Sequence, residues 1–191
     1  MNIGLFFGSF NPVHNGHVKI AREFLEHQYF EQVWLIVSPQ NPLKAQEGLA
    51  DQNHRLKMAQ LATENDENIK VSDVEFSLPV PSYTINTLNF LSDNYAHQFS
   101  IIMGADNIQS IDRWKDYLTL TNNYNIFVYK RDSYHIPDKY INLPNIKVVD
   151  FPFINISATA IRTVIKTTSN ASEYLSDSVL AYVKAHKLFK N

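Results

Sequence analysis

The stretch GLFFGSFNPVHNGH, from Gly4 to His17, constrains the fold more than any other part of the chain. The run from Ile3 to Phe7 is short and apolar, which is typical of a strand buried on both faces. Turn residues follow this run, and after Gly16 the apolar residues recur at helical spacing. The stretch therefore predicts a strand, a sharp turn and a helix.

This turn is a candidate site for a phosphate. The N–H groups of a helix's first turn point at the space above the preceding strand's carboxyl end, where the helix dipole also favours an anion. His14 and His17 flank Gly16, and each can donate a hydrogen bond, or a positive charge when protonated. Gly8 and Gly16 allow close approach of backbone and ligand. A histidine near a helix start is commonly a cap or surface residue, but the whole combination favours a binding site.

Length and composition fit one compact domain over residues 1–191, with a helical addition at about 157–191. Cysteine is absent and no apolar run approaches the ~20 residues of a membrane span. We therefore expect a cytoplasmic protein without membrane contact. The formal net charge of −2 argues against a broad nucleic-acid surface but allows a polyanionic small ligand.

The order of periodic segments predicts a Rossmann-like α/β fold, a doubly wound and mainly parallel sheet of five to six strands with helices on both faces. Further strands are expected at 32–38, 69–76, 99–104, 125–130 and 146–151. Helices are expected at 53–63, from Thr84, and at 172–188, the last packing on the sheet, and 137–144 is expected to be a loop. Polar residues after the strand ends should gather on one rim of the sheet.

Three such residues have a functional and a plain interpretation. Lys44, in the loop after the second strand, either is solvated or overhangs the first turn. Asp106 follows Gly104 at a strand end, which suits a ribose diol or hydrated Mg²⁺, or it merely caps the next helix. Trp114 either stacks on an aromatic ligand or fills the core. Arg55 is either functional or simply exposed, and we expect it to be exposed.

Two more segments place polar groups at helix starts. In LPVPSYTINT, Thr84 can cap a helix after a packed tyrosine, Tyr83; alternatively, the same N–H groups bind a carboxylate or amide of a second substrate. In ISATAIR, Ser157 stands at the N-cap position and Arg162 projects from the first turns. An N-cap serine and surface arginine would be the plain interpretation, but the pairing with the first turn favours a second phosphate clamp.

The first stretch resembles the HxGH nucleotidyltransferases, which move a nucleotidyl group from a nucleoside triphosphate to a phosphate or alcohol. The resemblance implies that His14 and His17 contact the triphosphate and stabilise the transition state. That superfamily usually has Asp before the proline of the turn, where this chain has Asn11.

Over essentially the whole chain, the segments FGSFNPVHNGH, SPQNPLK, PSYTINTL, MGADN, YKR and ISATAIR resemble the bacterial nicotinate mononucleotide adenylyltransferases. That resemblance implies transfer of AMP from ATP, with Mg²⁺, to nicotinate mononucleotide. The implied residues for ATP are Gly8, Ser9, Phe10, His14, His17, Gly104, Asp106, Arg131, Ser157 and Arg162, with His14, His17 and Arg162 catalytic. Those for the second substrate are Lys44, Tyr83, Thr84, Asp106 and Trp114. No protein ligand to a metal is implied.

Within that assignment, Thr84 and its backbone would bind the nicotinate carboxylate and Trp114 would stack on the pyridine ring. Asp106 would hold ribose hydroxyls, and Arg131 would lie near the adenosine. The alternatives are another acceptor, namely nicotinamide mononucleotide or phosphopantetheine, and a non-enzymatic ATP-binding module.

Overall fold

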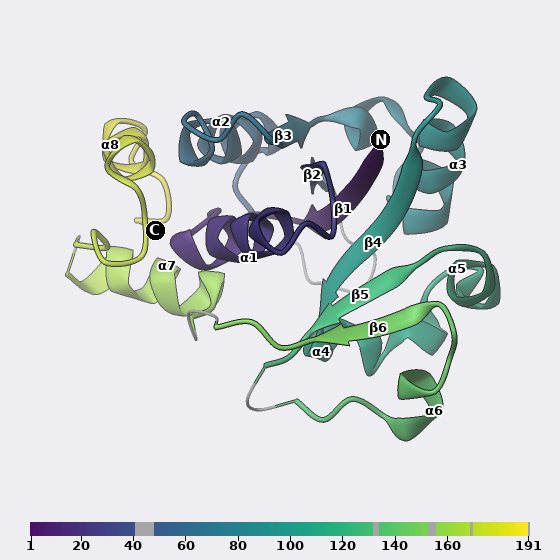
Figure 1. Ribbon diagram of the computed structural model, residues 1–191. Coiled ribbons are helices and arrows are strands. Elements are labelled where there is room, and N and C mark those ends of the chain that lie inside the picture. Colours follow the sequence, from purple (N-terminus) through teal and green to yellow (C-terminus); the bar gives the residue numbers. More distant parts are fainter. Residues whose placement is uncertain (41–47, 132–133, 153–155, 169, 191) are drawn as a thin grey trace.

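Six strands form one parallel sheet in the order β3-β2-β1-β4-β5-β6 (Figure 1). The computed structural model describes residues 1–40, 48–131, 134–152, 156–168 and 170–190. The strands are β1 (Asn2–Gly8), β2 (Gln32–Val37), β3 (Ile69–Ser72), β4 (Gln98–Gly104), β5 (Ile126–Tyr129) and β6 (Ile146–Val149). Every neighbouring pair is parallel. The predicted doubly wound, Rossmann-like sheet is confirmed, and its switch point lies between β1 and β4.

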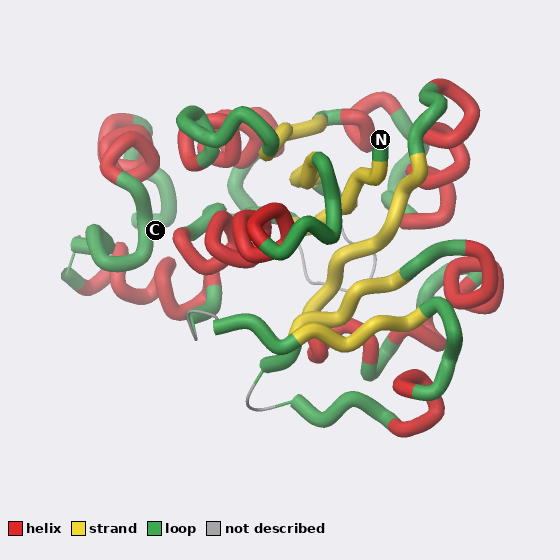
Figure 2. The backbone as a smooth tube through the Cα atoms, viewed as in Figure 1, coloured by secondary structure: helices red, strands yellow, loops and turns green. Residues whose placement is uncertain are grey.

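Helices cover both faces of the sheet (Figures 1 and 2). One face carries α1 (Asn15–Glu26), α2 (Gln52–Ala62) and α7 (Ala158–Thr167), and α8 (Asp177–Ala185) lies on the same side, against α2. The other carries α3 (Thr84–Asn94), α4 (Ala105–Ile108), α5 (Tyr117–Asn123) and α6 (Asp138–Ile141), with the 3₁₀ turns η1 (Val74–Ser77) and η2 (Ile111–Arg113) nearby. No helix among the described residues is long and apolar enough to cross a membrane.

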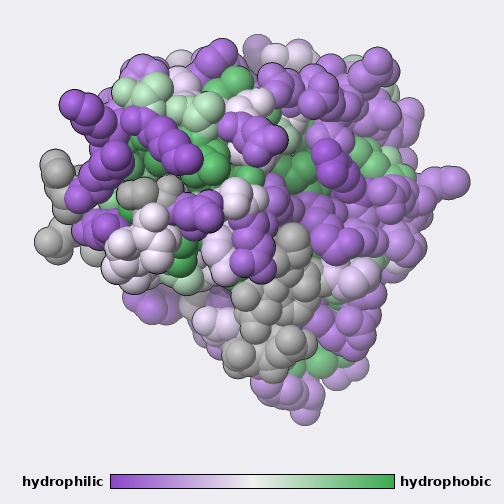
Figure 3. Space-filling view, turned by 90° about the vertical axis from the view of Figure 1, so that its left-hand side faces the viewer, coloured by the Kyte–Doolittle hydropathy of each residue, from purple (hydrophilic) through white to green (hydrophobic). Residues whose placement is uncertain are grey.

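The central strand is apolar on both faces because both faces are covered. Ile3 and Leu5 are fully buried and belong to the core beneath α3 and α4. Phe6 points the other way, into the core beneath α1 and α7. From the side of α7 and α8, hydrophilic residues cover most of the surface, with apolar side chains visible between them (Figure 3).

Two segments differ from the sequence prediction in the type of secondary structure that they form. The strand expected over 69–76 ends at Ser72, because the Phe76 N–H donates to the Asp73 carbonyl at 2.8 Å and turns the chain into η1. The loop expected over 137–144 contains α6, which begins after Pro137, where a missing N–H costs nothing, and is anchored by the buried ring of Tyr140.

The last helix is shorter than predicted and packs elsewhere. It begins at Asp177 because the Ser176 side chain accepts a hydrogen bond from the Val179 N–H. The expected packing on the sheet is wrong, since α8 lies against α2, where the Tyr182 hydroxyl and His54 Nδ1 are 2.9 Å apart.

Candidate functional site

The turn after β1 is built around a buried aromatic ring. Phe10 has a positive φ of 46° and is 3% exposed. A Cβ at Gly8 would lie 2.8 Å from this ring, so glycine is needed where the chain doubles back. The Phe10 ring then packs edge-on against His17, with centroids 5.1 Å apart. Phe10 therefore supports His17 from the interior.

The two histidines of the turn stack on each other, with ring centroids 3.6 Å apart. His17 Nδ1 accepts the backbone N–H of His14 at 3.2 Å, so the neutral His17 ring carries its proton on Nε2. His14 is 6% exposed, and its Nδ1 has no hydrogen-bond partner within the described parts of the chain. Burial, with a smaller contribution from Arg131, lowers the pKa of His14 from its usual 6.5 to about 4. At neutral pH His14 thus supplies a hydrogen bond rather than the positive charge that the sequence also allowed.

The first turn of α1 offers less free backbone than the sequence suggested. The Asn15 N–H donates to the carbonyl of Tyr174 at 2.8 Å, and the Asn15 side-chain amide donates to Glu173 at 3.2 Å. This first amide of the helix is therefore occupied, which leaves fewer N–H groups of the first turn to bind a phosphate. The contact also fixes the start of α1 against the segment that leads to α8.

The start of α7 meets the same turn. Ser157 caps α7 as predicted, accepting the N–H of Ala160 at 3.1 Å. Arg162 Nη1 donates to the carbonyl of Asn11 at 2.8 Å, and Nη2 donates to Thr159 Oγ1 at 3.1 Å. The two helix starts that the sequence singled out thus converge, which brings the Arg162 guanidinium to the histidine turn.

Asn11, which replaces the Asp usual in the resembling superfamily, has a specific role in this turn. It is 7% exposed, its Nδ2 donates to the Gly48 carbonyl at 2.9 Å, and its Oδ1 accepts the Ala50 N–H at 3.0 Å. A carboxylate could accept from Ala50 but could not donate to Gly48. The amide therefore joins the turn to the chain entering α2 in a way that Asp could not.

A small cavity of about 50 Å³ borders the histidines. It is lined by His14, Gly16, His17, Ile20, Tyr129, Arg131 and Ile156. Arg131 Nη1 lies 3.1 Å from Asp106 Oδ1. Burial lowers the pKa of Arg131, but the charge of this carboxylate raises it, and the pKa is raised overall. The cavity thus combines two imidazoles with a guanidinium, a set of groups suited to phosphate oxygens.

A larger cavity of about 460 Å³ lies on the other side of the β1 end. Six predicted residues line it, namely Gly8, Ser9, Tyr83, Thr84, Asp106 and Trp114. Gly104 is adjacent, and a Cβ there would meet the Asp106 carboxylate and the Tyr129 ring. The expectation that Thr84 caps α3 is wrong, because Tyr83 is the cap residue and its carbonyl accepts the Asn86 N–H at 2.9 Å.

Sequence reasoning missed two buried charged residues here. Glu75 lines the larger cavity, is 1% exposed and accepts the Thr87 hydroxyl at 2.7 Å, and burial raises its pKa. Its position in a predicted strand gave no functional signal. Arg55 was expected to be exposed but is 1% exposed, because its guanidinium bonds backbone carbonyls. Its spacing from Met58 and Ala59 on the inner stripe of α2 was the available signal.

Of the predicted site residues, only Lys44 lies outside the described residues. All the others lie around the carboxyl edge of the sheet, near the ends of β1, β4 and β5, at the starts of α3 and α7 or, for Trp114, directly after η2. No group of three or more His, Asp or Glu side chains that could hold a metal ion occurs within the described part of the chain. The expected gathering of these residues at one edge of the sheet is therefore observed.

Comparison with known proteins gives one consistent family. The cytidylyltransferase-like family model matches residues 5–164. Two relatives named "Probable nicotinate-nucleotide adenylyltransferase", from Flavobacterium psychrophilum and Flavobacterium johnsoniae, are each 42% identical, over 192 and 196 residues, and cover both chains completely. The nicotinic acid mononucleotide adenylyltransferase of Plasmodium falciparum, solved in complex with NaAD, has the same fold. Its TM-score is 0.85 at 18% identity, over 98% of this chain and 97% of that one.

Proposed function

The chain belongs to the cytidylyltransferase-like family, and from this premise we propose that it transfers AMP from ATP to nicotinate mononucleotide. The products are nicotinate adenine dinucleotide and pyrophosphate, and the reaction is a step of NAD biosynthesis. The observation that carries the proposal is the bond from Arg162 to the Asn11 carbonyl, which unites the start of α7 with the histidine turn. We place the enzyme in the cytoplasm.

The reaction is a single in-line displacement. A phosphate oxygen of nicotinate mononucleotide attacks the α-phosphorus of ATP, one P–O bond forms, and the bond from the α-phosphorus to the bridging oxygen of pyrophosphate breaks. The attacking phosphate is already mostly ionised near neutral pH, so no general base is needed. Alignment of the two phosphates and stabilisation of developing negative charge are what the protein must supply.

The triphosphate is assigned to the small-cavity side of the β1 end. His17 carries its proton on Nε2 and is aimed by the His14 N–H, so it is the donor assigned to the developing charge. His14 contributes a neutral donor, while Arg162 and the Ser157 end of α7 bind the outer phosphates. Arg131 lies next to the adenosine and Lys44 holds phosphate in the same assignment.

The second substrate is assigned to the larger cavity. Its volume of about 460 Å³ suits a mononucleotide, and its walls combine the aromatic rings of Tyr83 and Trp114 with polar groups. Thr84 begins α3, so its backbone N–H suits the nicotinate carboxylate. Trp114 stacks on the pyridine ring, and Asp106 binds ribose hydroxyls between the two cavities.

Mg²⁺ enters with ATP as part of the substrate. The phosphate oxygens of ATP are hard ligands that hold this ion together with several waters. It offsets negative charge on the triphosphate. Asp106 is a carboxylate that lines the larger cavity, but its ion pair with Arg131 suits it better to ribose than to this ion.

The direct test supplies the protein with ATP, Mg²⁺ and one acceptor at a time. We expect pyrophosphate and nicotinate adenine dinucleotide to form with nicotinate mononucleotide, at a higher kcat/KM than with nicotinamide mononucleotide. Product formed only with phosphopantetheine would transfer the assignment to another adenylyltransferase. ATP binding without any product would instead favour a binding module.

A further inference from the structure

Arg55 is the most deeply buried cation described in the protein, at 1% exposure. Its guanidinium makes four hydrogen bonds to the described part of the chain, all to backbone carbonyls. Nε donates to Ala50 at 2.8 Å, Nη1 to Ser9 at 2.7 Å and to Ser38 at 2.6 Å, and Nη2 to Pro39 at 3.0 Å. A fold seldom buries a guanidinium for packing alone, because removing the charge from water is costly.

Among the described residues, the charge of Arg55 has no direct carboxylate partner. No carboxylate within the described residues forms an ion pair with it. Burial lowers the pKa of Arg55 to about 10, opposed by the charge of Asp51, so the group stays protonated at neutral pH. The interior next to the turn therefore holds a positive charge whose hydrogen bonds, among the described residues, all go to backbone carbonyls.

Those carbonyls belong to the walls of the cleft. Ser9 and Ser38 both line the larger cavity, one after β1 and the other after β2. The Ser38 N–H also donates to the Gly8 carbonyl at 2.9 Å, so the two strand ends are already in contact. Arg55 adds a link between the carbonyls of Ser9 and Ser38. Because both carbonyl oxygens point toward Arg55, they point away from any anion in the cleft.

The same guanidinium also fixes the chain that enters α2. Ala50 is held twice, because its carbonyl accepts from Arg55 Nε and its N–H donates to Asn11 Oδ1. Asn11 in turn accepts from Arg162 through its backbone carbonyl. A continuous set of hydrogen bonds thus runs from Arg55 through Ala50 and Asn11 to a proposed phosphate ligand.

We propose that Arg55 is a positioning residue for the nucleotide cleft. It holds the ends of β1 and β2 in the geometry that the histidine turn requires, and it places a positive charge, paired with no described carboxylate, beside the turn to which the triphosphate is assigned. This inference rests on the proposed function, and it assigns Arg55 no contact with substrate. Its two parts, geometry and charge, are separable by substitution.

Arg55→Lys keeps the charge but loses the planar fork that reaches four carbonyls. We expect its kcat to fall about tenfold or more, with the KM for ATP changed less than about threefold, because misplaced groups lose mainly transition-state stabilisation. Arg55→Gln also removes the charge. We expect it to raise the KM for ATP about tenfold as well, and to weaken binding of inorganic triphosphate, measured by calorimetry, by a similar factor.

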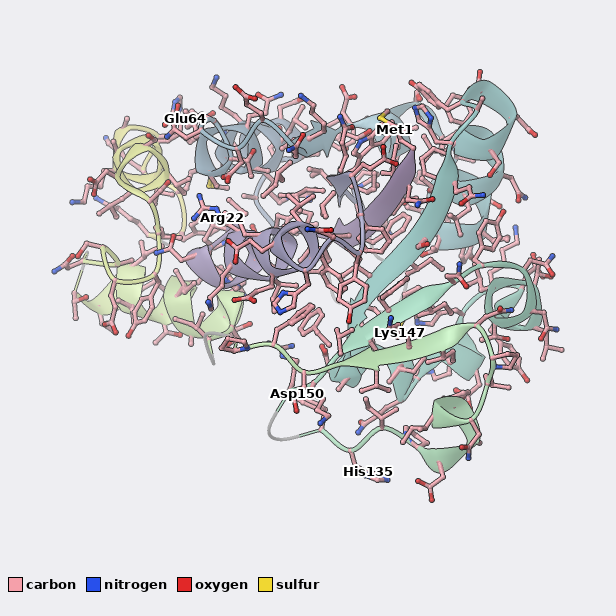
Figure 4. The ribbon with its side chains drawn as sticks, in the orientation of Figure 1. Met1, Arg22, Glu64, His135, Lys147 and Asp150 are labelled. Atoms are coloured by element: carbon pink, nitrogen blue, oxygen red, sulfur yellow. The ribbon has the colours of Figure 1, made fainter. Side chains whose placement is uncertain are left out.

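Arg22 provides the matched control. It projects from α1 on the side of α2 and α8 (Figure 4) and forms a bidentate pair with Asp66, at 2.8 and 2.9 Å. Arg22→Lys and Arg22→Gln should change the thermal midpoint at most and leave kcat and KM unchanged. All variants are assayed at a temperature where circular dichroism shows them fully folded.

Folded Arg55 variants that lose thermal stability but keep wild-type kcat, KM and triphosphate affinity would overturn the inference, since that is the behaviour of a residue with a purely structural role. If Arg55→Gln does not fold, Arg55→Lys decides alone through its kcat. A wild-type protein without adenylyl transfer would refute the proposed function instead, and triphosphate binding would then still test the charge.

Discussion

The two cavities beside the end of β1 differ in construction. The small one, of about 50 Å³, is lined by rings and a guanidinium that contact one another closely, with the histidines stacked at 3.6 Å and Phe10 behind them. The larger one, of about 460 Å³, is lined by separate segments around 75–84 and 106–115, and its walls combine aromatic rings with polar groups. The ion pair of Asp106 and Arg131 lies between them.

This contrast suits two tasks. Groups that stabilise a transition state act best when they are fixed before the substrate arrives, as the histidines are. Groups that recognise a second substrate need surface and shape, which rings and helix starts supply. Changes in the small cavity should therefore alter kcat, while changes in the larger one should alter the KM for the acceptor.

The largest effect is expected for His17→Ala. It removes the donor whose Nε2 proton is fixed by the His14 N–H, and loss of one such donor lowers kcat by about 10²–10³-fold. The KM for ATP should change much less. Steady-state kinetics with nicotinate mononucleotide measures both. If the KM for ATP rises while kcat is unchanged, His17 only binds ATP. That result would contradict the expectation that changes in the small cavity alter kcat.

His27→Ala is the control for this substitution. His27 follows the last residue of the same helix, α1, and is exposed on its surface, far along the helix from the turn. We expect wild-type kinetics from it. A similar loss of kcat in both variants would point to damage to α1 rather than to a role of the His17 ring.

The second effect concerns stability and follows from the pKa of His14. A folded-state pKa of about 4, against 6.5 when unfolded, means that only the unfolded chain takes up this proton between those pH values. The free energy of unfolding should therefore fall as the pH falls from 6.5 to 4, by about 3 kcal/mol in total from this group. Above pH 6.5 the group has no effect.

Urea unfolding at pH 7.5 and pH 4.5 measures this contribution by comparison with His14→Gln, which cannot take up a proton. The wild type should lose more stability on acidification than the variant does. Equal losses of stability in the wild type and His14→Gln would mean that the His14 ring is hydrated in the folded protein. The small cavity would then resemble the larger one.

The sequence predicted the sheet because short apolar runs alternate with segments whose apolar residues recur at helical spacing. Both patterns depend on burial alone. The sequence also predicted that the candidate residues gather at one edge because residues after parallel strands share that edge, as Asp106 and Arg131 do. It could not predict what depends on contacts between distant residues. The burial of Arg55, the neutral state of His14 and the occupied N–H of Asn15 all come from groups that only the folded chain brings together.

The smallest effect is expected from the two tryptophans, which test the larger cavity. Trp114 lines it, whereas Trp34 lies at the opposite edge of the sheet, with its ring against Tyr95 and Phe99. Trp114→Ala should raise the KM for nicotinate mononucleotide about tenfold, since stacking contributes about 1 kcal/mol beyond area, and should leave kcat nearly unchanged. Trp34→Ala should lower the thermal midpoint without altering the KM. A fall in kcat for Trp114→Ala would show instead that this ring helps to align the attacking phosphate, so that recognition and chemistry are not divided between the two cavities.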